Sequence, residues 1–455
     1  MKAFKKVSIL VVLAMLFVAV VPAAAQLGAT DISSFTVQNV DTEVATVTVH
    51  FYAEDGTVIT PSVLNDSQPN PFDLDPGASF AVYLPAIPDD QLDDGRYSVV
   101  IESSAKVVTI ANLIGQGDIY FNGSYSGFDG GADTFYLPSI EFNFYNWYSL
   151  ISVQNVGTDV ADILVTITCD DGTVGTLEAM DVPVNTAVHF DLETTIPDGF
   201  TSATSCNGSA EVTADQPVVA VDNQSASVSG NMQSYSGVAS GSAQVFAPGL
   251  YNSYYGWNGS LSIRKLGAGD TTVTVAYDDG DPDSTCDLTD AAPSCMLYMP
   301  TFHPTTGSFG ATVTNSANLE LVVVVNAANG SQAQTYNGVG AGSTNAVGIP
   351  STMVAYYGWD TALACQNVGT VPTTLHVAYD GYPTDAYDTA ELAPGETFEK
   401  VQYNETFLPD GHEGGATITA NADGALVACI VNFNNAAQMQ ATVGDWSMSY
   451  NAFAK

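Results

Sequence analysis

Positive charge is the scarcest feature of this sequence. Only nine of the 455 residues are Lys or Arg, against 49 Asp or Glu, and the formal net charge is −40. Nucleic acids and anionic lipid surfaces are bound through cationic side chains, so the sequence predicts neither partner. We expect an acidic, solvated exterior that attracts divalent cations only diffusely.

Catalytic motifs are lacking as well. The chain has five His and contains no H-E-x-x-H motif, no G-x-S-x-G motif and no phosphate-cradling Gly loop. Its carboxylates gather in predicted turns rather than around one cleft, so a pair of glycosidase acids is not indicated. We therefore expect no enzymatic activity and no required cofactor.

Long apolar runs are absent except for residues 7–21, which are too few for a comfortable membrane span. This run follows a lysine-rich start and precedes three alanines, the pattern of an export signal that is cleaved before Gln26. We expect residues 1–25 to be removed and the protein to be secreted, extracellular or at the cell surface, without membrane insertion.

Cysteine is sparse, with six residues, no C-x-x-C pair and no His clustered with the cysteines, so no zinc site is indicated. An even count in an exported protein favours disulfides, although spacing alone does not determine which cysteines pair. Two cysteines fall in each of the last three repeats described below. The expected pairs are Cys169–Cys206, Cys286–Cys295 and Cys365–Cys429.

A strand-like segment with a Gln-Asn dipeptide recurs along the chain and serves as an anchor for alignment. It occupies residues 35–40, 151–156 and 363–368, and a diverged copy at 262–266 carries Arg264-Lys265 instead. The Gln or Arg positions are 116, 110 and 102 residues apart. Each anchor leads into an alternating β-branched run that ends in Asp-Gly, which predicts a strand with one buried face and a tight hairpin.

These spacings predict an all-β fold of four tandem immunoglobulin-like β-sandwich repeats arranged as a rod. Each copy closes with a continuous apolar run, typical of a central strand. A bond between Cys365 and Cys429 is expected to staple the two sheets of repeat 4. The expected boundaries are residues 1–25 for the export signal and 26–134, 135–244, 245–346 and 347–455 for the repeats.

The ends of the chain differ from the junctions between repeats. A Tyr-x-Gly signature, a proline and an aromatic segment ending in Trp mark each junction, but repeat 1 has no leading strand before its anchor. Repeat 4 lacks Tyr-x-Gly, and its tail, residues 449–455, aligns with the start of a leading strand at 242–248. A sandwich that lacks an edge strand can accept one from another chain, and head-to-tail contacts that do not close produce fibres.

We therefore expect assembly between repeat 1 and the C-terminal tail of a neighbouring copy of this chain. In the alternative, residues 26–34 and local loops cover the edge within a stable monomer. The residues expected to mediate assembly are Ile32, Phe35, Val37, Tyr450 and Phe453.

Two further site types are candidates. An acidic loop with Asp279, Asp281 and Asp283 offers oxygen ligands for Ca²⁺, but its spacing is not that of an EF-hand loop, and a solvated acidic turn is the favoured interpretation. Seven Asn-x-Ser/Thr sequons are candidates for covalent glycans at surface positions. They are Asn65, Asn122, Asn207, Asn223, Asn258, Asn329 and Asn404.

Taken together, these motifs resemble the repeats of secreted surface proteins in filamentous, Chloroflexi-type bacteria. They are also similar to subunits of glycosylated extracellular fibrils that join by strand exchange.

The resemblance implies that the protein is a structural subunit of an extracellular filament or surface coat. It implies no catalytic residue in this chain. The alternatives are a secreted adhesin or glycan-binding protein acting as a monomeric rod, and a scaffold part of a larger envelope complex.

Overall fold

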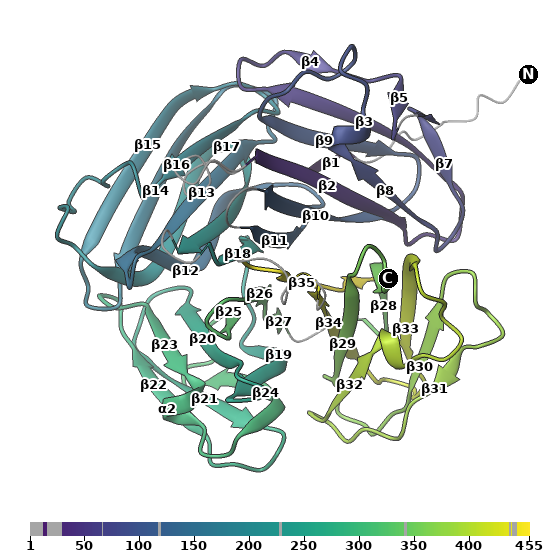
Figure 1. Ribbon diagram of the computed structural model, residues 1–455. Helices are drawn as coiled ribbons and strands as arrows, with labels where there is room; N and C mark the ends of the chain where they lie inside the picture. Colours follow the sequence, from purple (N-terminus) through teal and green to yellow (C-terminus); the bar gives the residue numbers. More distant parts are fainter. Residues whose placement is uncertain are drawn as a thin grey trace, which may run out of the picture.

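The computed structural model consists almost entirely of β-strands that pair antiparallel, in agreement with the all-β expectation (Figure 1). Within the described part of the chain, no helix has the length and apolarity needed to cross a membrane. The described residues are 30–65, 67–116, 120–226, 230–340, 344–435, 438 and 444–455, together with the backbone of residues 12–15.

Each repeat has an anchor sheet in which the Gln-Asn strand lies at the centre. The anchor strands are β2 (Thr30–Asn39), β13 (Trp147–Asn155), β20 (Asn258–Lys265) and β29 (Asp360–Asn367). Each pairs with a late apolar strand: β10 (Val107–Gln116), the second half of β17 (Cys206–Ala226), β25 (Leu321–Ala328) or β34 (Val427–Asn434). The outer neighbours are β8 (Ser79–Tyr83), β16 (Ala187–Asp191), β23 (Ser294–Tyr298) and β32 (Thr397–Val401).

The second sheet contains the alternating strands that the sequence predicted; in repeat 2 it is continuous with the anchor sheet, because β17 pairs in both and seven strands form one sheet. The alternating strands are β3 (Ala45–Ala53), β14 (Ala161–Cys169), β21 (Thr271–Tyr277) and β30 (Leu375–Tyr379). They pair with β9 (Tyr97–Ser103), the first half of β17, β24 (Gly307–Asn315) and β33 (His412–Ala420). Apolar side chains of both sheets meet between them; in repeat 3, for example, Ile263 of β20 joins Val273 and Val313 in one core. Alternate residues of these strands are buried because one face of the sheet lines that core.

Leading strands complete the second sheet in repeats 2 to 4. They are β12 (Ala132–Phe144), β19 (Gln244–Asn252) and β28 (Ala346–Val354), which pair with β17, β24 and β33. The remaining elements are β4 (Val58–Ile59), β5 (Val63–Leu64), β6 (Gln68–Pro69), β7 (Phe72–Leu74), β15 (Val174–Val182), β22 (Ser284–Leu288), β27 (Val339–Gly340), β31 (Tyr387–Asp388), the short helix α2 (Met299–Phe302) and the 3₁₀ turns Leu84–Ala86 and Gln402–Asn404.

The position that the leading strand takes in repeats 2 to 4 is also filled in repeat 1. β1 (Val12–Met15) pairs with β9, from Val12 opposite Glu102 to Met15 opposite Val99. β1 thus lies beside β9 as β12, β19 and β28 lie beside their partners. The strand comes from the segment that the sequence predicts to be an export signal, so its presence in the fold depends on whether that signal is retained.

The Gln-Asn dipeptide has a structural explanation. The Asn side chain closes the loop after the anchor strand: Asn155 Nδ2 donates to the carbonyl oxygens of Asp159 (2.7 Å) and Val182 (2.9 Å). In repeats 1 and 4 the preceding Gln side chain reaches another repeat: Gln38 Nε2 donates to the carbonyl of Ala416 (3.5 Å), and Gln366 Nε2 donates to the carbonyl of Ala311 (3.4 Å). In repeat 3 the departure from the motif strengthens this link, because Arg264 donates to Ser209 Oγ (2.8 Å) and to the Glu211 carboxylate (2.9 Å) of repeat 2.

A buried tyrosine holds each leading strand at an irregularity beside its proline. The hydroxyl of Tyr450 donates to the carbonyl of Ser351 (2.7 Å) and accepts its N–H (3.2 Å), and Tyr336 contacts Gly249 in the same way (2.7 and 2.9 Å). Tyr235 does so at Ser139. The pairing register of each leading strand shifts at this point. The tyrosine hydroxyl thereby satisfies backbone groups that the irregularity removes from the ladder.

The C-terminal tail belongs to repeat 4, and its alignment with a leading strand was wrong. Residues Ser447–Asn451 form β35, which pairs with β34, and β36 (Phe453–Ala454) pairs with the chain's own β28. The Ala452 N–H donates to Cys429 O (2.9 Å), as the Gly338 N–H donates to Val323 O (2.8 Å). Tyr450 is therefore the tyrosine of the Tyr-x-Gly signature, which was hidden because Ala452 replaces the glycine.

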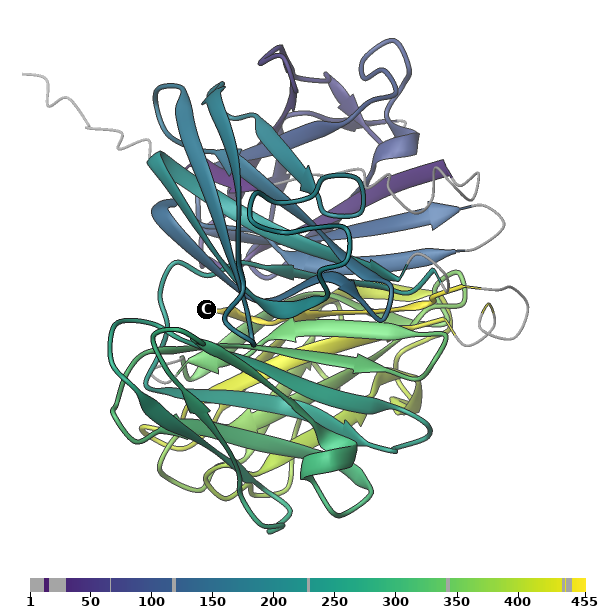
Figure 2. The ribbon, with the colours of Figure 1, turned by 90° about the vertical axis from the view of Figure 1, so that its left-hand side faces the viewer.

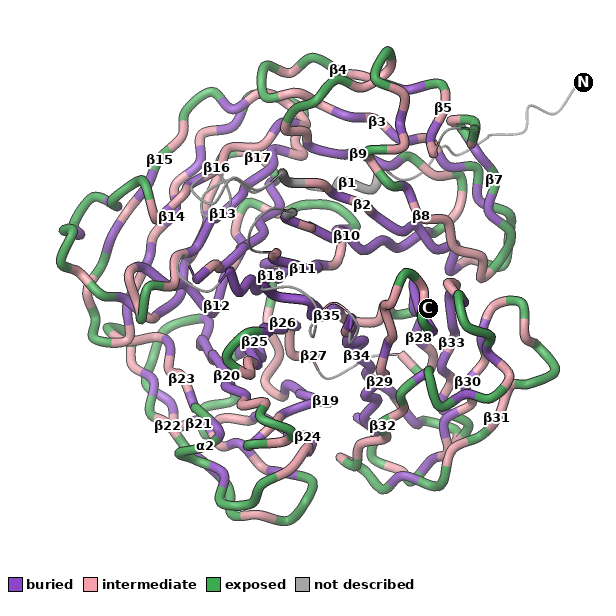
Figure 3. The backbone as a smooth tube through the Cα atoms, viewed as in Figure 1, coloured by how far each residue is buried: buried purple, intermediate pink, exposed green. Residues whose placement is uncertain are grey.

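In each repeat the strand that follows the late apolar strand meets its three counterparts at the centre of the molecule, so the expected rod is wrong (Figure 1). β11 (Phe121–Ser126) and β26 (Ala333–Asn337) each contact both β18 (Met232–Ser236) and β35, which closes a ring. β28 of repeat 4 also lies against β2 and β10 of repeat 1. From the side, repeats 1 and 2 form an upper layer over repeats 3 and 4 (Figure 2). The central strands are buried almost throughout (Figure 3).

The three disulfides join the two cysteines of each repeat as expected, but the bond in repeat 4 does not connect its two sheets. Cys365 and Cys429 lie directly opposite each other on β29 and β34, neighbouring strands of one sheet. Cys169–Cys206 likewise joins neighbouring strands β14 and β17. The bond that connects two sheets is Cys286–Cys295, between β22 and β23 of repeat 3.

Replacing Tyr450 by Phe should destabilise the protein, because the N–H and carbonyl of Ser351 would then be buried without the hydroxyl. The expected loss is about 1–3 kcal/mol of the free energy of unfolding, measured by calorimetry. Tyr357→Phe is the matched control, since this ring is 84% exposed. Equal stability of the two variants would contradict the structural role of the Tyr450 hydroxyl.

Candidate functional site

The residues expected to mediate assembly pack within the chain's own repeats. Phe35 and Val37 of β2 are fully buried, Tyr450 is 1% exposed, and Phe453 pairs with Gly348 of the same repeat; Ile32 is partly buried in β2. These side chains therefore serve the fold of a single chain. The tail does touch repeat 1 inside one molecule, where Lys106 Nζ donates to the Ala454 carbonyl (3.0 Å), but this side-chain contact is not the strand pairing that the sequence predicted.

The sequons divide by exposure. Asn122 and Asn223 are buried, at 0% and 1% exposure, so the expectation of a surface position was wrong for both. Asn404 is exposed and remains the most accessible candidate. Three further sequons, Asn65, Asn207 and Asn329, are partly buried, and Asn258 lines the cleft described below.

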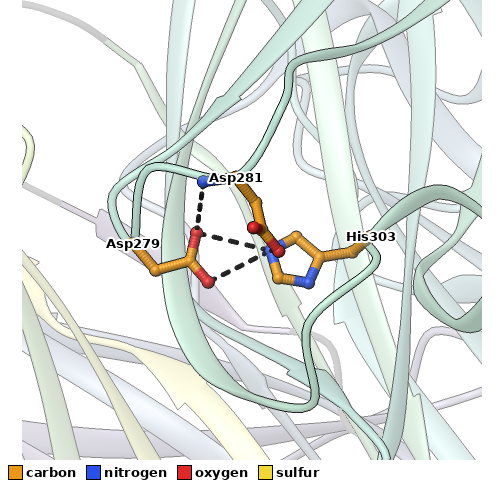
Figure 4. Close-up of side chains that lie close together, drawn as sticks. All are labelled: Asp279, Asp281 and His303. Carbon is orange, nitrogen blue, oxygen red and sulfur yellow. Dashed lines mark hydrogen bonds and ion pairs between the residues drawn. The ribbon is translucent and has the colours of Figure 1, made fainter.

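The acidic loop of repeat 3 does bring ligand atoms together, but not the expected three. Asp279 and Asp281 lie beside the buried His303 (Figure 4). The exposed Asp283 does not belong to this group. His303 follows α2 and is 22 residues from Asp281 in the chain, which is why loop spacing alone did not reveal it.

A buried carboxylate, Asp445, connects the repeats at the centre. Its side chain accepts the N–H groups of Met232 in repeat 2 (3.1 Å), Ala333 in repeat 3 (2.9 Å) and Ser447 in repeat 4 (3.0 Å). Its own N–H donates to the carbonyl of Tyr120 in repeat 1 (2.7 Å). Burial raises the pKa of Asp445 well above its ordinary value, and the three N–H donors oppose that rise.

A cleft of about 450 Å³ opens between repeats 2 and 3. Repeat 2 contributes side chains from β12, from the turn after it and from β18, and repeat 3 contributes side chains from β20, β23 and β25. The volume lies in the range of small-molecule sites. The lining residues are Glu141, Phe144, Tyr145, Gln233, Asn258, Ser260, Met296, Tyr298, Asn326, Ala327 and Ala328.

One position on the leading strand distinguishes this junction from the others. Three residues after the proline, repeat 2 carries Glu141, whereas repeats 3 and 4 carry Tyr251 and Met353. Tyr251 extends to the next repeat, where its hydroxyl accepts a hydrogen bond from Asn432 Nδ2 (3.0 Å). The shorter Glu141 cannot span the same gap, and the cleft occupies the space beside it.

Glu141 supplies a carboxyl group to the cleft. The residue is 9% exposed, and among the described residues its Oε2 has no hydrogen-bond partner. Its N–H donates to Ser149 Oγ (3.1 Å), which donates in turn to the buried Asp222 (3.0 Å). Burial, followed by the charge of Asp222, raises the pKa of Glu141 to about 8. Near neutral pH the side chain is therefore a protonated acid that can donate a hydrogen bond.

The cleft combines aromatic rings with polar groups that carry no charge near neutral pH. Tyr145 is 82% exposed and Tyr298 is 42% exposed, while Gln233, Asn258 and Asn326 supply amides. Aromatic faces pack against the C–H faces of a ring-shaped ligand, and amides and a neutral acid bond to its hydroxyls. The arrangement therefore suits an uncharged ligand that is rich in hydroxyl groups.

Glu141→Gln keeps a neutral side chain of the same shape but removes its titration. Because the pKa of Glu141 is raised from 4.5 to about 8 in the fold, its stabilising contribution is complete below pH 4.5 and is lost as the pH rises to about 8. The melting temperature of the wild type should therefore fall more steeply over this interval than that of the variant. At the upper end this rise in the pKa of Glu141 corresponds to a loss of about 5 kcal/mol of the free energy of unfolding.

Glu178→Gln, at an exposed position of β15, is the control and should reproduce the wild-type profile. Parallel pH profiles for the wild type and Glu141→Gln would show that burial does not hold the proton on Glu141.

Comparisons with known proteins found no family, but found distant structural likenesses. No family model and no curated protein matches the chain. A crystal structure of Thermotoga maritima 1070 is 18% identical with a TM-score of 0.20 and covers 24% of this chain and 94% of its own. A tetra-tandem repeat from the extending region of a large adhesion protein is 10% identical with a TM-score of 0.12, and covers 96% of this chain and 97% of its own. Likenesses this low carry no argument about the function of the chain.

Proposed function

We propose that the protein is a secreted surface protein that binds a glycan in the cleft between repeats 2 and 3 and catalyses no reaction on it. Secretion is supported by the predicted export signal and by three disulfides, which persist in oxidising compartments. Binding without catalysis is supported by the lack of catalytic motifs in the sequence.

The observation that carries the proposal is the placement of Tyr145. Its side chain is 82% exposed at the mouth of the cleft, and its backbone has a φ of +52°, an unfavourable conformation for a residue with a side chain. Tyr255 and Tyr357 share this exposure and a positive φ in the equivalent turns, but of the three tyrosines Tyr145 is the one that lines the cleft. The fold therefore holds a large aromatic ring in solvent beside amides and a neutral acid. A sugar bound there would cover the ring and bond to the amides through its hydroxyls.

A glycan array with the purified protein near pH 7, followed by titration calorimetry of the best ligand, tests this proposal. Tyr145→Ala should weaken binding roughly tenfold, because it removes the ring contact while leaving the fold intact. Tyr357→Ala is the matched control, since Tyr357 occupies the equivalent turn of repeat 4, is 84% exposed and does not line the cleft.

Binding to no glycan would reject the proposal. An equal loss of affinity in both tyrosine variants would place the ligand elsewhere and would also reject the cleft as its site.

A second candidate function, self-assembly into a coat or filament, is favoured by one observation. β1 covers the edge of β9 with residues 12–15, which belong to the predicted export signal. If a peptidase removes residues 1–25, this edge loses its partner and can accept a strand from another chain. The donor would not be the C-terminal tail, which lies within repeat 4.

Electron microscopy and light scattering should compare the secreted protein that begins at Gln26 with the chain that retains its first 25 residues. Strand addition at β9 predicts oligomers or filaments for the shorter chain alone. If both chains gave only single four-lobed particles, the proposal of self-assembly would be rejected.

A further inference from the structure

Three side chains from two segments of repeat 3 converge on one point (Figure 4). Asp279 and Asp281 lie in the turn between β21 and β22, and His303 lies between α2 and β24. His303 Nε2 is 3.2 Å from Asp279 Oδ2 and 3.3 Å from Asp281 Oδ2. The side chain of His303 is fully buried, whereas those of Asp279 and Asp281 are 30% and 21% exposed. The group is therefore closed on the histidine side and open to solvent on the aspartate side.

The hydrogen bond of His303 Nδ1 determines whether Nε2 faces the two carboxylates with a lone pair or with a hydrogen. Nδ1 lies 2.8 Å from the backbone carbonyl of Thr305, an atom that can only accept, so Nδ1 carries a hydrogen. In the neutral ring Nε2 then presents a lone pair to two carboxylates. A nitrogen lone pair in contact with two carboxylate oxygens requires a positive charge between them, either a proton on Nε2 or a metal ion.

The surroundings hold these three groups in place before any ion binds. The His303 ring stacks on the Phe309 ring with a centroid distance of 3.8 Å, and the Tyr277 ring lies nearly perpendicular to it with a centroid distance of 4.5 Å. Asp281 Oδ2 accepts the Thr305 N–H (3.0 Å), and Asp279 Oδ1 accepts the Asp281 N–H (3.1 Å). A histidine that donates its second N–H to a backbone carbonyl and carboxylates that accept backbone N–H groups are the outer-shell contacts expected around a bound metal.

We propose that Asp279, Asp281 and His303 bind one divalent transition-metal ion, with zinc as the best fit. Zinc lies about 2.0–2.1 Å from nitrogen and oxygen ligands, and two ligand atoms at a tetrahedral angle around it are therefore about 3.3 Å apart. The distances from His303 Nε2 to the Oδ2 atoms of Asp279 and Asp281, 3.2 and 3.3 Å, match this separation. The imidazole ligand disfavours Ca²⁺ and Mg²⁺, which take oxygen ligands. The fourth position faces solvent and takes a water molecule.

Such an ion would join the β21–β22 turn to the segment that follows α2. The helix α2 itself begins directly after Tyr298, which lines the cleft. The proposal does not depend on glycan binding, because none of the three ligands lines the cleft.

The test is a titration of the chelator-treated, disulfide-intact chain with ZnCl₂ by calorimetry, in excess Ca²⁺ and salt to suppress diffuse attraction to the acidic surface. One saturable site per chain is expected, with an increase in melting temperature. Asp279→Asn should weaken this site by roughly 100-fold and abolish the increase. Asp283→Asn, at an exposed position in the same turn but outside the group, should bind as the wild type does.

Asp281→Asn is the second ligand variant, and near-ultraviolet circular dichroism checks that each variant is folded. Loss of the site in folded Asp279→Asn and Asp281→Asn, with retention in Asp283→Asn, supports the proposal. The absence of a saturable site in the wild type would mean that a proton alone joins the three groups, and would overturn it. An equal loss in Asp283→Asn would show only diffuse attraction and would overturn it as well.

Discussion

One buried carboxylate connects all four repeats. Asp445 accepts N–H groups from repeats 2, 3 and 4 with its side chain and bonds to repeat 1 with its backbone N–H. Each of those N–H groups would cost about 1–3 kcal/mol if buried without a partner, so the centre is stable only while the carboxylate stays in place. The closed arrangement of β11, β18, β26 and β35 thus depends on a polar contact rather than on apolar packing alone.

Because the ring is closed, repeat 4 contacts repeat 1 of the same chain rather than repeat 1 of a neighbouring chain. A head-to-tail contact produces a fibre when it stays open and a ring when it closes, and here it closes within one molecule. The leading strand of each later repeat packs on another repeat, β28 on repeat 1 included, so these edges are covered. The edge of β9 is covered instead by β1, which belongs to a segment with the features of an export signal.

Local patterns in the sequence predicted local structure well, and long-range contacts poorly. The alternating runs became β3, β14, β21 and β30, the cysteines pair as expected, and Asp279 and Asp281 do lie together. The ring was missed because Asp445, between Gly444 and Trp446, has the sequence context of an ordinary surface turn. His303 and Glu141 were missed because burial by distant segments, which leaves no mark in nearby sequence, gives them their roles.

The differences among the three leading strands have a further consequence. In a homotetramer of a single such module, symmetry would place the same residue at every junction. Covalent linkage in tandem removes that constraint, so Glu141, Tyr251 and Met353 occupy equivalent positions in one molecule. Gene duplication followed by fusion would thus allow one junction to specialise while its counterparts continue to hold the assembly together.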